Sequence, residues 1–317
     1  MTTMPYPLKK ILLPYDGSAG AQNALALAAP LVVAGGAAVR QLTLLMVLDG
    51  GYLARHLQNV DLRVRRLEQD KEWRRIRQRY LEEEVLPLLA AGKKILADLG
   101  VVAPVEVRVA DGRVDKEILR LAREEAYSTI IMGRRGLSPL KALLLGSVTR
   151  NVLSQAEDVT IFVAGLNPPP REGCPISPML LPVDGSEYSL AAVRQATALA
   201  QAFKHHKPRL LLLHVIDEAT LGITISQGTE VLVAQGEAAL AAARSSLKEA
   251  GLDGLWEEKL VTGNPAQVIL QEAEAGKHSL IMMGSQGRSA LAKLIMGSVT
   301  RTVVNSATRP AVGVVYA

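Results

Sequence analysis

The sequence LLPYDGS at residues 12–18 returns as LLPVDGS at residues 180–186, with six of the seven positions identical. Each copy is a short apolar run that ends at an aspartate, followed by Gly-Ser and a longer segment rich in alanine and leucine. Such a run is typical of a buried strand, and a serine ahead of an Ala/Leu-rich segment is typical of a helix start. Both halves of the chain are therefore predicted to begin with the same strand-to-helix unit.

A second repeated stretch lies near the end of each half. GRRG at 133–136, followed by GSVTR at 146–150, matches GSQG at 284–287, followed by GSVTR at 297–301. Its offset, 284 − 133 = 151 residues, is 17 shorter than the offset of the first repeat, 180 − 12 = 168. The chain is therefore a tandem duplication, and its first copy carries a net insertion.

These offsets define the expected domain organisation. We expect a first domain at residues 1–166, with an inserted basic helical segment at about 51–99. A Pro-rich linker is expected at 167–177, where three consecutive prolines favour an extended connector. The second domain is expected at 178–317.

Short apolar runs of strand length alternate with helix-like segments throughout both halves. Expected strands are residues 10–15, 42–47, 105–109, 129–133 and 160–164, then 179–183, 208–215, 257–262, 280–284 and 311–316; the clearest helices are 189–203 and 231–250. Nearly continuous apolar strands separated by helices indicate a parallel sheet covered on both faces. The sequence therefore predicts a doubly wound α/β domain, twice over.

Composition excludes several classes of protein. The 317 residues are 49% hydrophobic, which is enough for packed cores and excludes disordered and fibrous chains. The one cysteine, Cys174, excludes an intramolecular disulfide and a cysteine-rich zinc site, and it favours a reducing compartment. No apolar run approaches the roughly 18–20 residues of a spanning helix. We therefore expect a cytoplasmic protein that is neither secreted nor embedded in a membrane.

The net charge of +5 belongs to the first half, largely to the basic stretch 63–79. The few aromatic residues, two Phe, two Trp and seven Tyr, are scattered, so nucleic-acid binding is not expected. Glu82–Glu84 follow the basic run, and Arg79 is spaced to pair with Glu83. We expect a solvated, salt-bridged helix face with a kink or break at Pro87, and docking of an unknown protein partner through segment 61–79 is the alternative.

The repeated glycines predict phosphate binding. In both halves two glycines follow the fourth strand, and after nine further residues Gly-Ser begins a helix. Glycine lets the backbone approach a phosphate, and the N–H groups at a helix start favour an anion. The sequence has neither a Gly-x4-Gly-Lys-Ser/Thr loop nor a Gly-x-Gly-x-x-Gly after the first strand. The alternatives are a flexible loop before an ordinary capped helix and, for the first-strand aspartates, a purely capping role.

The chain resembles tandem universal stress proteins of the ATP-binding subgroup. The resemblance rests on Gly-x2-Gly-x9-Gly-Ser in both halves, on Pro-x-Asp at Pro14/Asp16 and Pro182/Asp184, and on Leu-His-Val at residues 213–215 with Gly-x-Pro at residues 263–265. It implies two Rossmann-like, adenine nucleotide alpha hydrolase-like domains, each with a five-stranded parallel sheet. It also implies that the protein binds ATP with Mg²⁺. The final strands, at 160–164 and 311–316, would pair one domain with another, either within the chain as a pseudo-dimer or in a homodimer.

The resemblance implies specific contacts. The aspartates would contact ribose or adenine beside the prolines, four strand residues would line the adenine pocket, and the glycine loops would hold the triphosphates. For the first site these residues are Pro14, Asp16, Val47, Met132, Gly133, Gly136, Gly146, Ser147 and Val148; for the second they are Pro182, Asp184, Val215, Met283, Gly284, Gly287, Gly297, Ser298 and Val299.

The first half departs from this pattern at two places. Arg113 and Val114 follow Gly112 where Gly-x-Pro is expected, and Met46 replaces the histidine before Val47. Arg134 and Arg135 stand where the second loop has Ser285 and Gln286. The arginines are expected either to add charge-assisted contacts to phosphate or to point to solvent.

We assign no catalytic residue and no metal ligand. The five histidines show no HxxxH or HExxH spacing, His205 and His206 are expected in a surface loop, and His214 is expected to pack at a strand end. The leading hypothesis is therefore an ATP-binding module whose occupancy changes its conformation or choice of partner. The alternatives are a slow ATPase or adenylate-forming enzyme, and a nucleotide-independent scaffold that docks through the inserted helix.

Overall fold

The computed structural model describes residues 4–49, 71–136, 145–166, 174–219, 229–287 and 296–316. All ten expected strands are present, and their ends differ from the expected ones by at most two residues. The first half contains β1 (Lys10–Pro14), α1 (Ala19–Gly35), a 3₁₀ turn (Gly36–Ala38), β2 (Gln41–Leu48), α4 (Lys71–Tyr80), a π-helical segment (Leu81–Val85), α5 (Leu86–Asp98), β3 (Val105–Asp111), α6 (Val114–Glu124), β4 (Thr129–Gly133), α7 (Ser147–Gln155) and β5 (Thr160–Ala164).

The second half repeats this order. It contains β6 (Met179–Pro182), α8 (Glu187–Ala202), a 3₁₀ turn (Lys204–His206), β7 (Leu210–Asp217), α10 (Thr229–Glu249), β8 (Trp256–Gly263), α11 (Pro265–Ala275), β9 (Leu280–Gly284), α12 (Ser298–Ser306) and β10 (Ala311–Val315). The predicted duplication of a Rossmann-like α/β unit is therefore confirmed.

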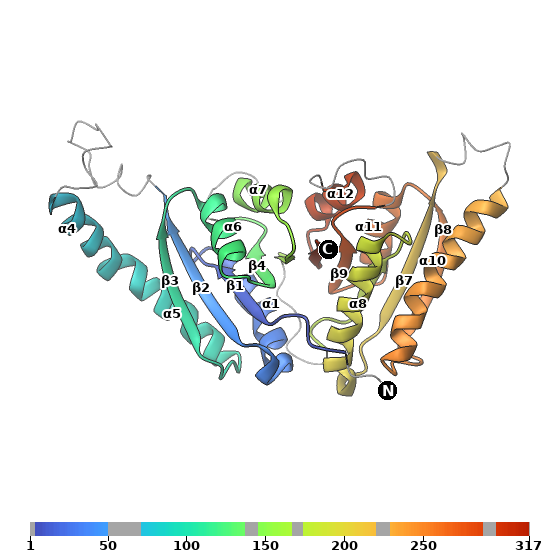
Figure 1. Ribbon diagram of the computed structural model, residues 1–317, viewed down its shortest axis with the longest axis horizontal. Helices are drawn as coiled ribbons and strands as arrows, with labels where there is room; N and C mark the ends of the chain where they lie inside the picture. Colours follow the sequence, from blue (N-terminus) through green and yellow to red (C-terminus); the bar gives the residue numbers. More distant parts are fainter. Residues whose placement is uncertain are drawn as a thin grey trace.

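The strands form a single ten-stranded sheet in the order β3-β2-β1-β4-β5-β10-β9-β6-β7-β8 (Figure 1). Neighbouring strands are parallel within each half. The halves join through β5 and β10, which run antiparallel with Val163 opposite Val312 and Thr160 opposite Val315. The expectation that the last strands connect the two halves is therefore confirmed, and two five-stranded sheets continue as one.

Burial along the strands follows their place in the sheet. Strands β5, β9 and β10 are buried along their whole length, because helices cover both faces of the sheet. The outermost strands β3 and β8 alternate partly buried apolar residues with exposed charged ones such as Glu106 and Arg108. Charged side chains on the edge strands protect the sheet from pairing with another chain.

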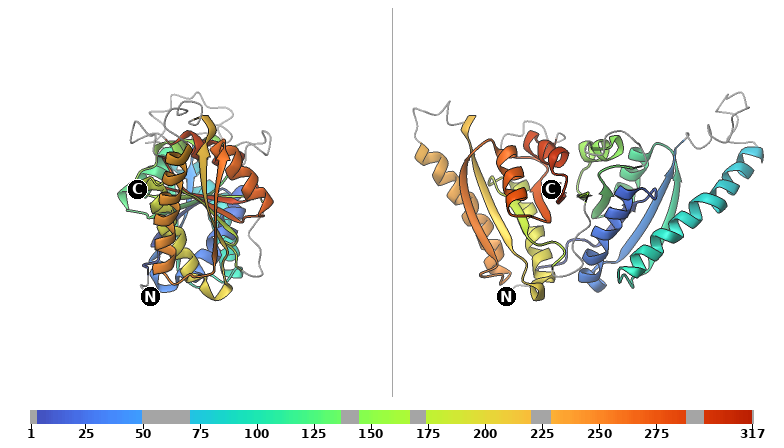
Figure 2. Two further views of the ribbon diagram at one scale, coloured as in Figure 1. Left: turned by 90° about the vertical axis from the view of Figure 1, so that its right-hand side faces the viewer. Right: turned by 180° about the vertical axis from the view of Figure 1, so that it is seen from behind.

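Helices cover the sheet in two layers (Figure 2). One core lies under α1, α5, α8 and α10, and the other lies under α6, α7, α11 and α12. Both cores run through the two halves: Leu13 and Leu181 belong to the first, and Ile130 and Ile281 to the second. Because the cores are shared, the two copies stabilise each other.

Helix α1 corrects one expectation from the sequence. Residues Ala19–Ala38 are long and apolar enough to cross a membrane by length and composition, although no such run was expected. Leu25, Ala28 and Leu31 of this helix are buried in the core. Its apolar character therefore reflects its place between the sheet and its neighbouring helices, α5 and α8.

Part of the insertion lengthens a helix that both halves possess: residues 71–98 are 28 helical residues in the first half, against 21 in α10. α4, the π-helical segment and α5 follow one another without a break and precede β3, as α10 precedes β8. The helix of the first half begins farther ahead of its strand in the sequence than α10 does. Pro87 lies in the first turn of α5, directly after the π-helical segment, where a missing N–H breaks no α-helical hydrogen bond. Arg79 lies 4.0 Å from Glu83 with both side chains exposed, as expected, and Arg77 makes a 2.6 Å ion pair with Asp111 of β3. Residues 51–70 lie outside the described part.

Candidate functional site

A cavity of about 390 Å³ opens beyond the carboxyl ends of β6, β7 and β9 in the second half. Strand order reverses here, because β6 pairs with β7 on one side and with β9 on the other. Such switch points are where open α/β sheets bind ligands, and the volume lies within the usual range for small-molecule sites.

The cavity brings together all nine residues predicted for the second site. They lie on four separate segments: the end of β6 with the turn after it, the carboxyl half of β7, the end of β9 with its loop, and the start of α12. These residues are Pro182, Asp184, Val215, Met283, Gly284, Gly287, Gly297, Ser298 and Val299. Residues 288–295, which complete the predicted glycine loop, lie outside the described part.

The aspartate after β6 organises the turn into α8. Asp184 Oδ1 accepts hydrogen bonds from the backbone N–H and the hydroxyl of Ser186, at 3.0 and 2.6 Å. Ser186 in turn caps α8, because its hydroxyl accepts from the N–H of Ser189 at 3.1 Å. The capping role considered from the sequence is therefore present. Asp184 Oδ2 lies toward the glycine loop, 2.7 Å from the position that a Cβ of Gly287 would take.

Helix α12 presents an uncapped N-terminus to the same cavity. Its N-cap residue is Gly297, and no side chain of the described residues caps its first turn, whereas α1, α8 and α11 are capped by Ser18, Ser186 and Asn264. The first N–H groups of an α-helix have no intrahelical partner, so they are available to an anion. Helix α7 repeats this arrangement, with Gly146 as its N-cap and no side-chain cap.

Six further polar residues line the cavity without having been predicted as site residues: Ser189, His214, Asp217, Gln235, Gln286 and Thr300. Asp217 ends β7 and accepts from the N–H of Ala219 at 3.1 Å, and Gln235 reaches the cavity from α10. His214 is buried, and its Nδ1 lies 2.7 Å from the carbonyl of Val183, so it packs as expected while also lining the cavity. Asp217 was detectable as an acid at a strand end, but Gln235 carries no motif.

The charges on the lining residues are all negative. Asp184 and Asp217 are its only charged side chains among the described residues. No group of three or more His, Cys, Asp or Glu residues fit to hold a metal ion occurs in the described ranges. A polyphosphate in this cavity would therefore rely on backbone N–H groups and on a cation that it brings with it.

The predicted residues of the first half gather at the equivalent sheet edge. Asp16 Oδ1 accepts from the N–H and hydroxyl of Ser18, at 3.1 and 2.6 Å, and Oδ2 lies 2.4 Å from the position of a Cβ on Gly136. Pro14 ends β1, Val47 lies near the end of β2, and Met132 and Gly133 end β4. Gly146, Ser147 and Val148 lie at the start of α7. Residues 137–144 of this loop lie outside the described part.

The first half is packed differently around this edge. Gly20 approaches the loop so closely that a Cβ would lie 2.1 Å from the carbonyl oxygen of Arg135. The equivalent residue of the second half, at 20 + 168 = 188, is Tyr188. The close contact between the first glycine loop and α1 therefore requires glycine at residue 20. In the second half the equivalent position has room for a side chain.

The first half has Met46 in place of His214, and a second position, on the following helix, also differs between the halves. His214 lies against Gly236 of α10, where a Cβ would be 2.7 Å from His214 Cδ2. The equivalent pair in the first half, at 214 − 168 and 236 − 151, is Met46 and Val85. At these two positions the first half thus has a flexible methionine and a bulkier helix residue, where the second half has a planar histidine and a glycine.

Arg113 directly precedes the position where the family pattern has proline. Its guanidinium bonds to the buried carboxylate of Asp115. Its Nε and Nη2 donate to the two oxygens of Asp115 at 2.8 and 2.7 Å, and Asn151 donates to the same carboxylate at 2.9 Å. The hydrogen bond from Arg113 lowers the pKa of Asp115 to about 2. This network links the start of α6 to α7.

Arg134 follows neither course expected from the sequence. Its side chain, 2% exposed, leaves the first loop and reaches the C-terminal end of α12 in the other half. Nη1 donates to the carbonyls of Val304 and Ala307 at 2.9 and 2.6 Å, and Nη2 donates to that of Asn305 at 2.7 Å. Burial lowers the pKa of the guanidinium. The guanidinium of Arg134 is therefore bound to the end of α12 and shielded from solvent, because the unpaired carbonyls of a helix C-terminus attract it.

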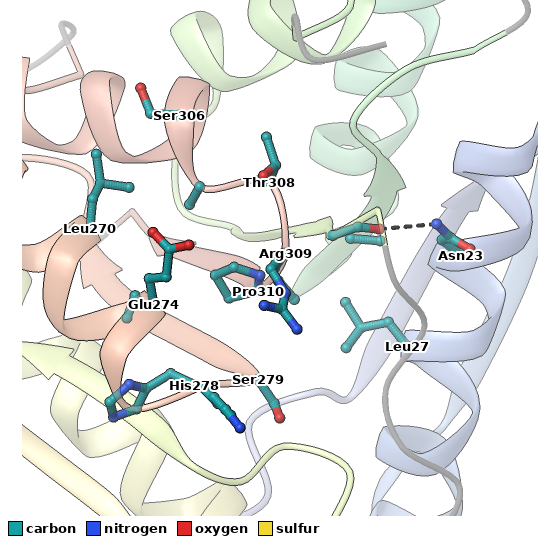
Figure 3. A pocket seen from close by; sticks show the side chains of 16 residues that line it. Asn23, Leu27, Leu270, Glu274, His278, Ser279, Ser306, Thr308, Arg309 and Pro310 are labelled. Atoms are coloured by element: carbon teal, nitrogen blue, oxygen red, sulfur yellow. Dashed lines mark hydrogen bonds between the residues drawn. The ribbon is translucent and has the colours of Figure 1, made fainter.

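A second cavity of about 280 Å³ lies at the junction of the halves, between α1, the end of β5, and the C-terminal ends of α11 and α12 (Figure 3). Arg309 lies between Glu274 on one side and Asn23 on the other. Gly165 lines this cavity, whereas the equivalent residue, at 165 + 151 = 316, is Tyr316, whose hydroxyl donates to the carbonyl of Leu153. This cavity contains none of the predicted site residues.

The fold and the site define a tandem α/β protein with a switch-point cavity beside a glycine loop. The profile of the Universal stress protein family matches residues 7–162 and 175–314. The chain therefore belongs to the universal stress protein family, as the sequence resemblance indicated.

Individual relatives agree with this assignment. A universal stress protein from Mycolicibacterium smegmatis is 27% identical over 72% of this chain and 76% of its own length. A crystal structure of a universal stress protein from Archaeoglobus fulgidus has a TM-score of 0.65 with 22% identity, covering 98% of each chain, which supports the fold. A universal stress protein solved in complex with cAMP is 26% identical over 44% of this chain and 94% of its own, with a TM-score of 0.32.

Proposed function

We propose that this protein binds ATP in the switch-point cavity of its second half, and that occupancy regulates its conformation or its choice of partner. The observation that carries the proposal is the convergence of a glycine loop, an uncapped helix N-terminus and an aspartate on one cavity of suitable size. The N–H groups of α12 would receive phosphate oxygens, and Gly287 and Gly297 would allow the close approach. Val215 and Met283 would pack against the adenine, and Asp184 would accept from a ribose hydroxyl.

The charge of the cavity favours ATP accompanied by a divalent cation. Two aspartates line the cavity and no lysine or arginine does so among the described residues, so a bare triphosphate would meet net repulsion. A Mg²⁺ ion bound to the phosphates reduces that repulsion and requires few protein ligands. We expect chelation by EDTA to weaken ATP binding.

We propose a second, equivalent site in the first half. It would use Asp16, the loop that begins at Gly133, and the uncapped N-terminus of α7. The close packing at Gly20 and the pair Met46/Val85 give this site a different shape. We therefore expect the two sites to differ in affinity.

Matched charge substitutions at the two helix starts test this function. Ser147 and Ser298 are exposed first residues of α7 and α12, so Ser147→Glu and Ser298→Glu preserve the helices while repelling phosphate. Calorimetry with MgATP should give two sites per chain in the unchanged protein, one in each single variant and none in the double variant. Ser245→Glu, an equal charge change on the outer helix α10, serves as the control. Unaltered stoichiometry and affinity in the double variant would refute the proposal.

A further inference from the structure

Arg134 connects the first glycine loop to the helix that forms part of the second cavity. Its backbone carbonyl accepts from the N–H of Gly146 at 2.8 Å, so the residue belongs to the frame of the first loop. Its guanidinium forms three hydrogen bonds with carbonyls at the C-terminal end of α12. One side chain thus spans both halves of the duplication.

Helix α12 is short, and its two ends meet different halves of the molecule. Its nine residues extend about 13 Å at 1.5 Å per residue. Its first residues, Ser298 to Thr300, line the second cavity, while its last turn is held by Arg134. A helix of this length moves as a rigid unit, so a constraint on its C-terminus also constrains the N–H groups that face the cavity.

Among the described residues, the second loop makes no equivalent contact with the C-terminal end of α7. The residue equivalent to Arg134 in the second loop is Ser285, at 134 + 151 = 285, whose side chain is far shorter. The C-terminal end of α7 is instead met by the hydroxyl of Tyr316, which follows β10 and belongs to no glycine loop. Only the first loop therefore contacts the end of the opposite helix in this way, within the described ranges.

We infer that Arg134 is a positioning residue that aligns the N-terminus of α12 for phosphate binding in the second cavity, and that it links this alignment to the state of the first loop. This inference rests on the proposed function. When Arg134 is held by the loop, α12 keeps its N–H groups directed into the cavity. Removal of the guanidinium releases the C-terminal end of α12, so the helix can tilt about its remaining anchor, the 2.8 Å hydrogen bond from Thr300 to the carbonyl of Gly284. This tilt misplaces the phosphate contacts, while the adenine contacts on β7 and β9 are left in place.

The test uses the full chain with the first site disabled by Ser147→Glu, so that binding reports the second cavity alone. In this background Arg134→Ser introduces the residue of the other loop, and Arg134→Lys retains a cation able to reach fewer carbonyls. Arg123→Ser, which removes an exposed arginine from α6, is the matched control. The affinity for MgATP and for adenosine, which lacks phosphate, is measured by calorimetry for each protein.

We expect Arg134→Ser to weaken MgATP binding by about fivefold or more, a typical coupling effect, with adenosine affinity unchanged and Arg134→Lys intermediate. An equal loss for MgATP and adenosine would show that Arg134 only supports the fold, and no loss for either would show that α12 needs no alignment; both results overturn the inference. If the Ser147→Glu parent binds no MgATP, or if adding Ser298→Glu does not abolish binding, the proposed function itself fails before Arg134 is tested.

Discussion

The carboxylate of Asp184 lies directly against Gly287, so that a Cβ at residue 287 would be 2.7 Å from Oδ2. The same relationship holds between Asp16 and Gly136, at 2.4 Å. In both copies the first-strand aspartate and the second loop glycine thus form one unit, although more than 100 residues separate them in the chain.

Substitution of Gly287 should disturb this unit and the cavity with it. In Gly287→Ala the methyl group must displace a carboxylate whose other oxygen is held by Ser186, so we expect MgATP affinity at the second site to fall about tenfold, or about 1.4 kcal/mol. Ser245→Ala, on the outer helix α10 and away from the cavity, is the control and should leave this affinity unchanged. Calorimetry in the Ser147→Glu background measures both. Equal losses in the two variants would contradict this account.

The halves differ at the pair His214/Gly236, so a second substitution at this pair should restore stability that a first one removes. Gly236→Val should destabilise the protein by about 1–3 kcal/mol, because its side chain would collide with the imidazole and with Leu260. Adding His214→Met recreates the Met46/Val85 pair of the first half and should restore part of that loss. Urea unfolding of the two single variants and the double variant measures the coupling. Strict additivity of the two changes would argue against direct packing between them.

The buried carboxylate of Asp115 should contribute to stability in a defined pH window. Arg113 lowers its pKa from 3.8 to about 2 in the folded protein, so the contribution is present above pH 4 and is lost as the pH falls toward 2. This pKa shift corresponds to about 2 kcal/mol of stability. Solvent around the largely exposed Arg113 screens the ion pair and lowers the expected contribution to about 1–2 kcal/mol. The difference in unfolding free energy between wild type and Asp115→Asn should therefore shrink over this range. A difference independent of pH would exclude the proposed ionic origin.

The Tyr316 hydroxyl should stabilise the junction of the halves. Its hydrogen bond to the carbonyl of Leu153 satisfies the end of α7, and burial raises the pKa of the phenol. Tyr316→Phe leaves this carbonyl without its donor and should cost about 1–3 kcal/mol. Thermal and urea unfolding measure the loss. Ser154→Ala, which removes a hydroxyl from the same helix that bonds only within it, is the control and should cost less.

The sequence by itself determined the duplication, the positions of the strands and of the clearest helices, and nine of the residues that line the second cavity. These features depend on local patterns: apolar runs that end in aspartate, glycines at fixed spacing and a helix start at Gly-Ser. In parallel strands such patterns place Asp184, Gly284 and Ser298 at one edge of the sheet whatever the detail of packing.

Only the tertiary structure decided the contacts between the copies. Arg134 bonds to carbonyls some 170 residues away, and no sequence pattern distinguishes an arginine that faces phosphate from one that caps a distant helix. Likewise, Gly165 lines the cavity at the junction of the halves, whereas the equivalent Tyr316 bonds to the carbonyl of Leu153. These features depend on side-chain direction and on which surfaces meet when β5 pairs with β10, and both are settled only when the two halves pack together.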